Sequence, residues 1–104
     1  MEITRVKLEI FIPEENVETL REALAKAGAG IIGNYDHCCS VTPVKGNWRP
    51  LEGANPYDGT VGAVSEGHEK KVEVNCPRNI LPRVINAIRA VHPYEEPLIN
   101  IIPL

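Results

Sequence analysis

Two stretches of this sequence carry apolar residues at every second position, and each is followed by apolar residues at helical spacing. The first alternation covers residues 6–12 and the second covers residues 69–76. A period of two predicts a half-buried strand, whereas apolar residues three and four positions apart predict an amphipathic helix. A short chain with strand and then helix in two places has few folds open to it, because both helices must bury their apolar stripes against a sheet.

The two expected helices have recognisable ends. The first begins after Pro13, has acidic residues in its first turn where the helix dipole favours them, and ends at Gly28. The second covers residues 80–91 and tolerates Pro82, because that residue lies in the first turn. His92 precedes a proline and therefore closes this helix, since such a residue avoids the helical region. The apolar stripe of the first helix consists of Val17, Leu20, Ala23, Leu24 and Ala27.

The segment between these two units predicts a hairpin and a long loop. Gly33-Asn34 marks a sharp bend, and residues 36–42 have the composition of a strand. Gly46-Asn47 is a turn pair between β-prone residues, so residues 48–51 are expected to return along that strand. Residues 52–62 are rich in turn formers and predict an ordered loop. Such a loop is either a simple excursion at a hairpin end or a functional or interfacial segment.

The order of elements predicts an α+β, ferredoxin-like βαββαβ fold over a single domain, residues 1–104. The closing strand, residues 98–102, carries apolar residues on both of its faces. Two helices cover only one face of a four-stranded sheet. We therefore expect another copy of the chain to cover the second face, unless the strand simply exposes one isoleucine.

Composition argues against several classes of function. A net charge of −3 with scattered lysines provides no basic surface for nucleic acid. No apolar run approaches the roughly 20 residues of a membrane helix, and the first residues lack the pattern of a signal peptide, so a cytoplasmic location is expected. The cysteines, Cys38, Cys39 and Cys76, fit reduced thiols better than a disulfide framework, and no C-x-x-C zinc spacing is present.

One candidate metal site combines two distant parts of the sequence. On the strand expected over residues 36–42, alternation places His37 and Cys39 on one face, and such a pair can bind zinc or copper. A further ligand is expected from His92, Glu95 or Glu96. The second and fourth strands of this fold lie on opposite edges of the sheet. The two groups of ligands can therefore meet only across a subunit boundary.

Each of these residues also has a structural interpretation. Cys38 or Cys39 can serve as a small core residue. His92 can cap the second helix in its cationic form and pair there with the neighbouring glutamates on the surface. Trp48 either frames a small-molecule pocket together with Asn55-Pro56-Tyr57 or anchors an oligomer, and we favour the anchor. Neither a phosphate-binding glycine loop nor a nucleophile set can be assigned from spacing.

Three motifs resemble the inserted domain of the bacterial NGG-interacting-factor-three-like (NIF3-like) proteins. They are Gly33-Asn34-Tyr35 with His37-Cys38, the run from Pro50 to Tyr57 (Pro-Leu-Glu-Gly-Ala-Asn-Pro-Tyr), and His92-Pro93-Tyr94-Glu95-Glu96. The last motif is also similar to a turn of the CutA divalent-cation-tolerance proteins. Both groups are PII-like members of the ferredoxin-like class. The resemblance therefore implies a PII/CutA-like fold, a trimer assembled through sheet edges and the long hairpin, and ligands bound in clefts between subunits.

In the larger NIF3-like proteins a two-metal site lies in flanking domains that this sequence does not contain. Their nucleotide-hydrolase activity is therefore not implied for this chain. The expected function is that of a non-enzymatic, oligomeric module that binds a divalent metal ion, a small ligand or a partner protein at subunit clefts. Two alternatives stay open, namely a purely structural assembly module and an enzyme acting on a nucleotide-like substrate.

Overall fold

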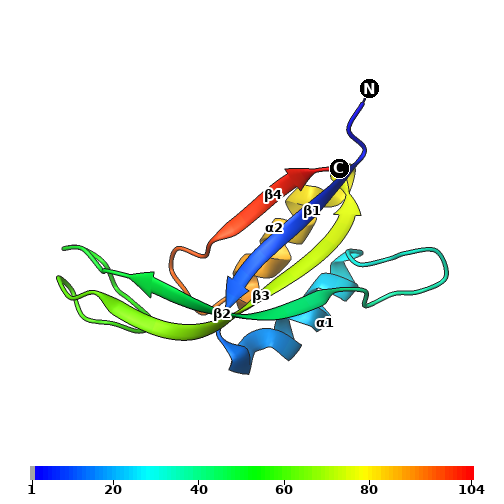
Figure 1. Ribbon diagram of the computed structural model, residues 1–104. Coiled ribbons are helices and arrows are strands. Elements are labelled where there is room, and N and C mark those ends of the chain that lie inside the picture. The colour runs from blue at the N-terminus through cyan, green and yellow to red at the C-terminus, as the bar shows by residue number, and fades with distance from the viewer. Residues whose placement is uncertain (1) are drawn as a thin grey trace.

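The computed structural model describes residues 2–104, and over this range it forms a four-stranded antiparallel sheet with two helices on one face (Figure 1). The order across the sheet is β2-β3-β1-β4. This is the expected ferredoxin-like βαββαβ fold. The strands are β1 (Arg5–Ile12), β2 (Ser40–Trp48), β3 (Ser65–Pro77) and β4 (Ile99–Pro103). The helices are α1 (Val17–Ala27) and α2 (Leu81–Val91), preceded by the 3-10 turns η1 (Glu14–Asn16) and η2 (Arg78–Ile80).

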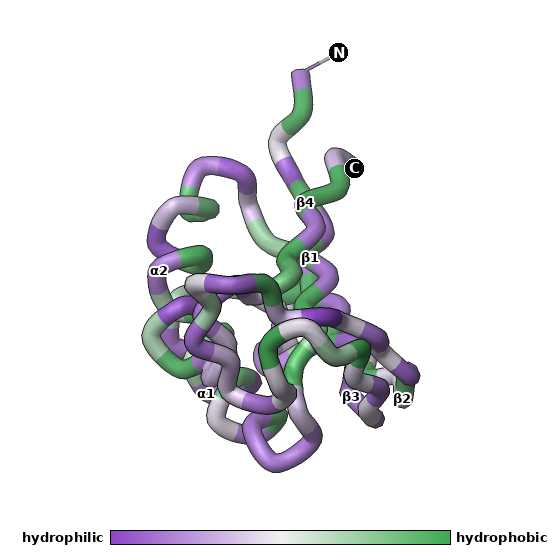
Figure 2. The backbone as a smooth tube through the Cα atoms, turned by 90° about the vertical axis from the view of Figure 1, so that its left-hand side faces the viewer, coloured by the Kyte–Doolittle hydropathy of each residue, from purple (hydrophilic) through white to green (hydrophobic). Residues whose placement is uncertain are grey.

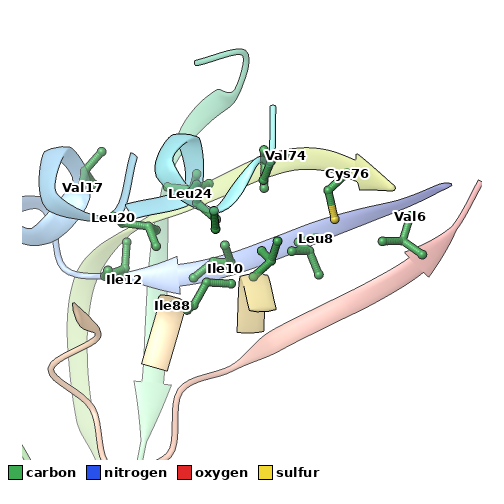
Figure 3. Packing of buried hydrophobic residues seen from close by; sticks show 14 residues of the cluster. Val6, Leu8, Ile10, Ile12, Val17, Leu20, Leu24, Val74, Cys76 and Ile88 are labelled. Carbon is green, nitrogen blue, oxygen red and sulfur yellow. The ribbon is translucent and has the colours of Figure 1, made fainter. Parts of the chain in front are cut away.

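The core lies between the helices and the sheet, which form two layers (Figures 2 and 3). Alternation along β1 buries every second residue, and Leu8 and Ile10 lie opposite Val74 and Val72 of β3. Full burial of one such side chain stabilises the fold by about 1.5–3 kcal/mol relative to an exposed position. Both helices contribute their predicted stripes to this layer, and the buried helical residues are Val17, Leu20, Leu24, Ala27, Val84 and Ile88.

The predicted C-terminal ends of both helices are confirmed, whereas α1 begins only at Val17 and α2 at Leu81, each after a 3-10 turn. Gly28 ends α1 in the left-handed region, with φ at 98°, where a glycine carries no steric cost. Pro82 lies in the first turn of α2, and the N–H of His92 makes the last helical bond, to Ile88 O at 2.9 Å. None of the described helices is long and apolar enough to cross a membrane.

The segment between α1 and β3 differs from the prediction. β2 begins at Ser40 and continues through Gly46 and Asn47, so the predicted turn at this pair and the returning strand over residues 48–51 are wrong. The chain returns instead as β3, and Gly46 pairs with Gly67 across the two strands. Glycine is needed here for close approach rather than for turning. A Cβ atom on Gly46 would meet the Glu69 carboxylate, and one on Gly67 would lie 3.0 Å from Cη2 of Trp48.

The sharp bend predicted at Gly33-Asn34 is confirmed. Ile32 and Tyr35 exchange backbone hydrogen bonds of 2.9 and 3.0 Å across the bend, and Gly33 has a positive φ of 56°. Glycine at the first central position suits a tight two-residue turn. This hairpin projects beyond the end of the sheet (Figure 1) and exposes the side chains of Ile31, Ile32 and Tyr35.

The face of the sheet opposite the helices is charged at its centre. Lys7 Nζ lies 2.9 Å from Glu73 Oε2 and 3.7 Å from Glu9 Oε2, and Lys71 reaches the same two carboxylates at 3.6 and 3.9 Å. Ile102, opposite Lys7, adds an apolar side chain near the β4 edge. The expectation that apolar surface on this face requires a covering copy is therefore wrong for the centre of the sheet. Cross-strand pairs of opposite charge are stable there without a partner.

Candidate functional site

A cleft of about 570 Å³ lies where three segments meet, namely the outer half of the β2–β3 ribbon, the loop that joins these strands, and the turn between α2 and β4. Its walls are largely apolar, and its volume is typical of small-molecule sites. A wider hollow of about 730 Å³ beside Arg5, Pro77 and Arg78 is more open and has no aromatic wall among its described lining residues. The apolar side chains in the wall of the first cleft include Phe11, Trp48, Leu51, Pro56, Tyr57, Tyr94 and Leu98.

The floor of the cleft depends on the paired glycines Gly46 and Gly67. Because neither carries a side chain, the ring of Trp48 lies against Gly67 and the carboxylate of Glu69 lies against Gly46. Trp48 Nε1 donates a hydrogen bond of 3.0 Å to the carbonyl of Asp58, which holds the loop over the strands. Trp48 therefore anchors a loop of its own chain.

His92 fixes the turn after α2. Its side chain is 8% exposed, Nε2 lies 2.7 Å from Phe11 O, and Nδ1 lies 3.2 Å from the Tyr94 N–H. This arrangement requires the neutral tautomer that donates from Nε2 and accepts at Nδ1. Burial lowers the pKa of His92, against a smaller opposing effect of the Phe11 carbonyl. The expected cationic helix cap is therefore wrong, and neither ring nitrogen is free to bind a metal in this conformation.

The tyrosines of the cleft are held by carboxylates. Tyr94 donates to Glu69 Oε2 at 2.7 Å, and its ring lies 5.9 Å from that of Tyr57 at a tilted angle favoured by aromatic pairs. Tyr57 donates to Glu15 Oε1 at 3.2 Å. Burial and then Glu69 raise the pKa of Tyr94 far above its usual value, and the bond to Glu15 raises that of Tyr57. Tyrosine is protonated at neutral pH in any case, and these contacts move the ionisation of both phenols to still higher pH.

Glu95 joins the turn to the loop. Its Oε2 accepts a hydrogen bond of 2.8 Å from the backbone N–H of Asn55, whereas Glu96 lines the cleft beside it. With the bonds made by Trp48 and Tyr57, the loop is tied to the rest of the chain at three points among the described residues. The loop predicted over residues 52–62 is therefore ordered, as expected.

The structure separates the predicted metal ligands within one chain. His37 precedes β2 in a left-handed conformation, with φ at 58°, so the alternation argument that paired it with Cys39 is wrong. Its ring nitrogens lie 2.9 Å from Asp36 Oδ1 and 3.3 Å from Glu22 Oε2, and these bonds raise its pKa, with Asp36 contributing most. Cys39 packs against the core, as its structural interpretation predicted. Over residues 2–104 no three His, Cys, Asp or Glu side chains form a metal-binding group.

Sequence reasoning found part of the cleft. Trp48, Pro56 and Tyr57 line it, as the small-molecule alternative predicted, and Asn55 takes part through its N–H. It missed Glu69, because a charged residue on a strand looks like an ordinary exposed one. The two ribbon glycines are the signal that could have indicated it, since glycine inside a strand marks a close approach.

Comparison with known proteins identifies relatives along most of the chain, although no protein-family model matches it. It is 42% identical over 98 residues to the GTP cyclohydrolase 1 type 2 homolog of Bacillus subtilis, a match covering 94% of this chain and 26% of that protein. The protein of the same name from Mycobacterium bovis is 43% identical over 95 residues, covering 91% and 25%. The chain thus spans about a quarter of the length of these curated relatives.

Two solved structures are similar to the chain in fold. The periplasmic divalent cation tolerance protein CutA from Archaeoglobus fulgidus has a TM-score of 0.72 at 20% identity, covering 96% of this chain and 83% of that one, which shows a shared fold. The Bacillus cereus protein related to NIF3 has a TM-score of 0.85 at 35% identity, covering 97% and 26%. The chain therefore has the ferredoxin-like fold that CutA also has. More particularly, its sequence and fold are similar to one part of these longer, NIF3-related proteins.

Proposed function

We propose that this domain is a non-enzymatic module that binds a small molecule in the cleft between the β2–β3 ribbon and the turn after α2. The observation that carries the proposal is the aromatic wall formed by Trp48, Tyr57 and Tyr94, which come from three different segments of the chain. Preformed, mostly apolar clefts with a few fixed polar groups are the usual form of small-molecule sites.

The polar groups of the cleft favour binding over catalysis. A general base needs a free lone pair and a pKa near the working pH. His92 uses both ring nitrogens within the fold, and Tyr94 is held protonated next to Glu69. Glu95 is used to fix the loop. These groups therefore shape and support the cleft rather than activate a substrate.

Trp48 provides the experiment, because it is the one tryptophan of the sequence and lines the cleft. Its fluorescence should change saturably when a library of small, flat compounds is titrated against the protein. Replacing Tyr57 by alanine should weaken any such ligand, whereas replacing the exposed Tyr35 outside the cleft should not. A library without hits in both fluorescence and thermal-shift assays would contradict the proposal.

Assembly and metal binding are the finer parts of the proposal. We infer from the likeness to CutA that copies associate, with a trimer favoured, and that the exposed His37 of one copy shares zinc or copper with Glu95 and Glu96 of another. Calorimetry with either ion should then give heat that His37→Ala removes and His68→Ala, at an exposed strand position, retains. Equal heat from both variants, or none from the unmodified protein, would exclude this site.

A further inference from the structure

We infer that the cleft is selective for small organic cations with a flat apolar body, an inference that rests on the proposed function. The charged groups of the lining are mainly acidic. The carboxylates are Asp58, Glu69, Glu95 and Glu96, and the cations are Lys45 and Arg49. Lys45 Nζ is also bound 2.9 Å from Glu66 Oε1, a carboxylate outside the lining. The cleft thus combines aromatic faces with excess negative charge.

Glu69 is the carboxylate best placed to meet a bound cation. It lies half-buried against Gly46 on the floor of the cleft, and its Oε2 is fixed by Tyr94 at 2.7 Å. The Trp48 ring lies beside it over Gly67. A cation above this floor would face the carboxylate and the ring together. Each cation–aromatic contact at a partly exposed site strengthens binding by roughly a factor of two to five.

The phenols of the cleft respond to the same negative field. Burial contributes most to the raised pKa of Tyr94, and Glu69, Asp58 and Glu15 raise it further. Asp58 also contributes to the raised pKa of Tyr57. A field that opposes the ionisation of a phenol favours a cation and opposes an anion. An anionic ligand such as a nucleotide would meet Glu69, Glu95 and Glu96 unfavourably.

Three probes that share one ring and differ in charge test the inference on the full chain. They are phenethylammonium, the neutral 2-phenylethanol and the anion 3-phenylpropionate, titrated by Trp48 fluorescence and by calorimetry. The ammonium probe should bind at least about fivefold more tightly than the alcohol, and the anion should bind most weakly. Raising the salt concentration should bring the affinities of the three probes closer together, because salt screens exposed charges.

Variants that remove one carboxylate charge test which residues cause the preference for the ammonium probe. Glu69→Gln keeps an acceptor for Tyr94, and Glu96→Gln changes a lining carboxylate exposed to solvent. Each should weaken the ammonium probe about threefold more than it weakens the alcohol. The matched control is Glu52→Gln, which makes the same charge change on the exposed loop outside the lining. The control should bind all three probes like the unmodified protein.

The possible outcomes separate the two proposals. Equal affinity for all three probes, or no loss in Glu69→Gln and Glu96→Gln, would overturn the cation preference and leave a ligand-binding cleft. A Trp48 signal that ignores every probe but changes on dilution would show that a second copy occupies the cleft, which overturns both. Charge-dependent binding that only the lining variants weaken supports the inference.

Discussion

At the scale of single residues, His92 is the side chain on which the turn after α2 most depends. Among the described residues it is the buried polar side chain, and its two ring nitrogens bond to Phe11 of β1 and to Tyr94. Its backbone N–H makes the last bond of α2. A polar side chain buried in this way stabilises only while its bonds are complete. Its role is therefore structural, in contrast to the metal ligand expected from sequence.

Replacing His92 by leucine should destabilise the domain by about 1–3 kcal/mol, because the carbonyl of Phe11 then loses its buried donor. Denaturant unfolding measures the change. His68→Leu is the matched control at an exposed position of β3, where the effect should stay within about 0.5 kcal/mol. Equal stability of the two variants would mean that the His92 hydrogen bonds do not contribute to the free energy of unfolding.

The protonation of His92 predicts a pH dependence. Its pKa is lower in the folded than in the unfolded chain, so the unfolded state binds the proton more strongly. The His92 contribution is therefore complete above about pH 6.5 and is lost as the pH falls below that value toward the folded pKa. His37, with its raised pKa, acts in the opposite direction.

Comparison with His92→Leu isolates this effect, since His37 is present in both proteins. Between pH 7.5 and pH 5.5, unfolding free energies should fall more for the unmodified chain than for the variant. Parallel pH profiles for the two proteins would show that His92 does not titrate differently on folding.

At the scale of elements, the β2–β3 ribbon and its loop act together. The two strands pair continuously from Ser40 to Trp48, and the Gly46–Gly67 pair lets large side chains lie flat on the ribbon. The loop is then held by bonds from Trp48, Glu95 and Tyr57. Its order depends on other elements rather than on a core of its own.

Removing the Glu95 side chain should release the loop without unfolding the domain. Glu95→Ala deletes the acceptor of the Asn55 N–H, so this amide should exchange with solvent several times faster while global stability changes by less than about 1 kcal/mol. Hydrogen exchange followed by NMR measures both quantities. Glu96→Ala is the neighbouring control and should leave Asn55 unchanged. If Asn55 exchanges equally in all three proteins, the bond does not hold the loop.

At the scale of the whole molecule, the exposed apolar side chains of the strands lie at the sheet edges rather than at the centre of its open face. The centre of that face is charged and paired within the chain. The edge strand β2 instead exposes Val41, at 42%, and β4 exposes Ile101, at 46%. Unpaired edge strands are the natural place for a second copy to bind.

Light scattering should therefore give a mass above the 11.5 kDa of one chain. Val41→Lys should lower that mass, because a charge on an edge strand opposes pairing with another edge. Val64→Lys provides the comparison, since Val64 is exposed in the loop outside the strands. A single-chain mass at every concentration would rule out the trimer and, with it, the metal site shared between copies.

The sequence by itself determined the two strand–helix units, their caps and the order of the elements. These features depend on neighbours within a few positions, as in the alternation of β1 and the glycine that ends α1. For Trp48 it favoured an oligomer anchor and left a pocket shared with Tyr57 as the alternative, and both residues do line the cleft. The local pattern gave a wrong turn at Gly46-Asn47. The same residue pair is found in tight turns and in strands where a glycine lets another side chain pack closely.

Only the tertiary structure decided the roles of His92, Glu69 and Glu95. Their partners, Phe11, Tyr94 and Asn55, are 81, 25 and 40 positions away along the chain. No spacing rule reaches such distances, because the contacts depend on how the sheet and the loop come together. The same limit applies to the predicted metal site. Residue type suggested His92 as a ligand, whereas in the fold both of its ring nitrogens bond to backbone groups of the chain.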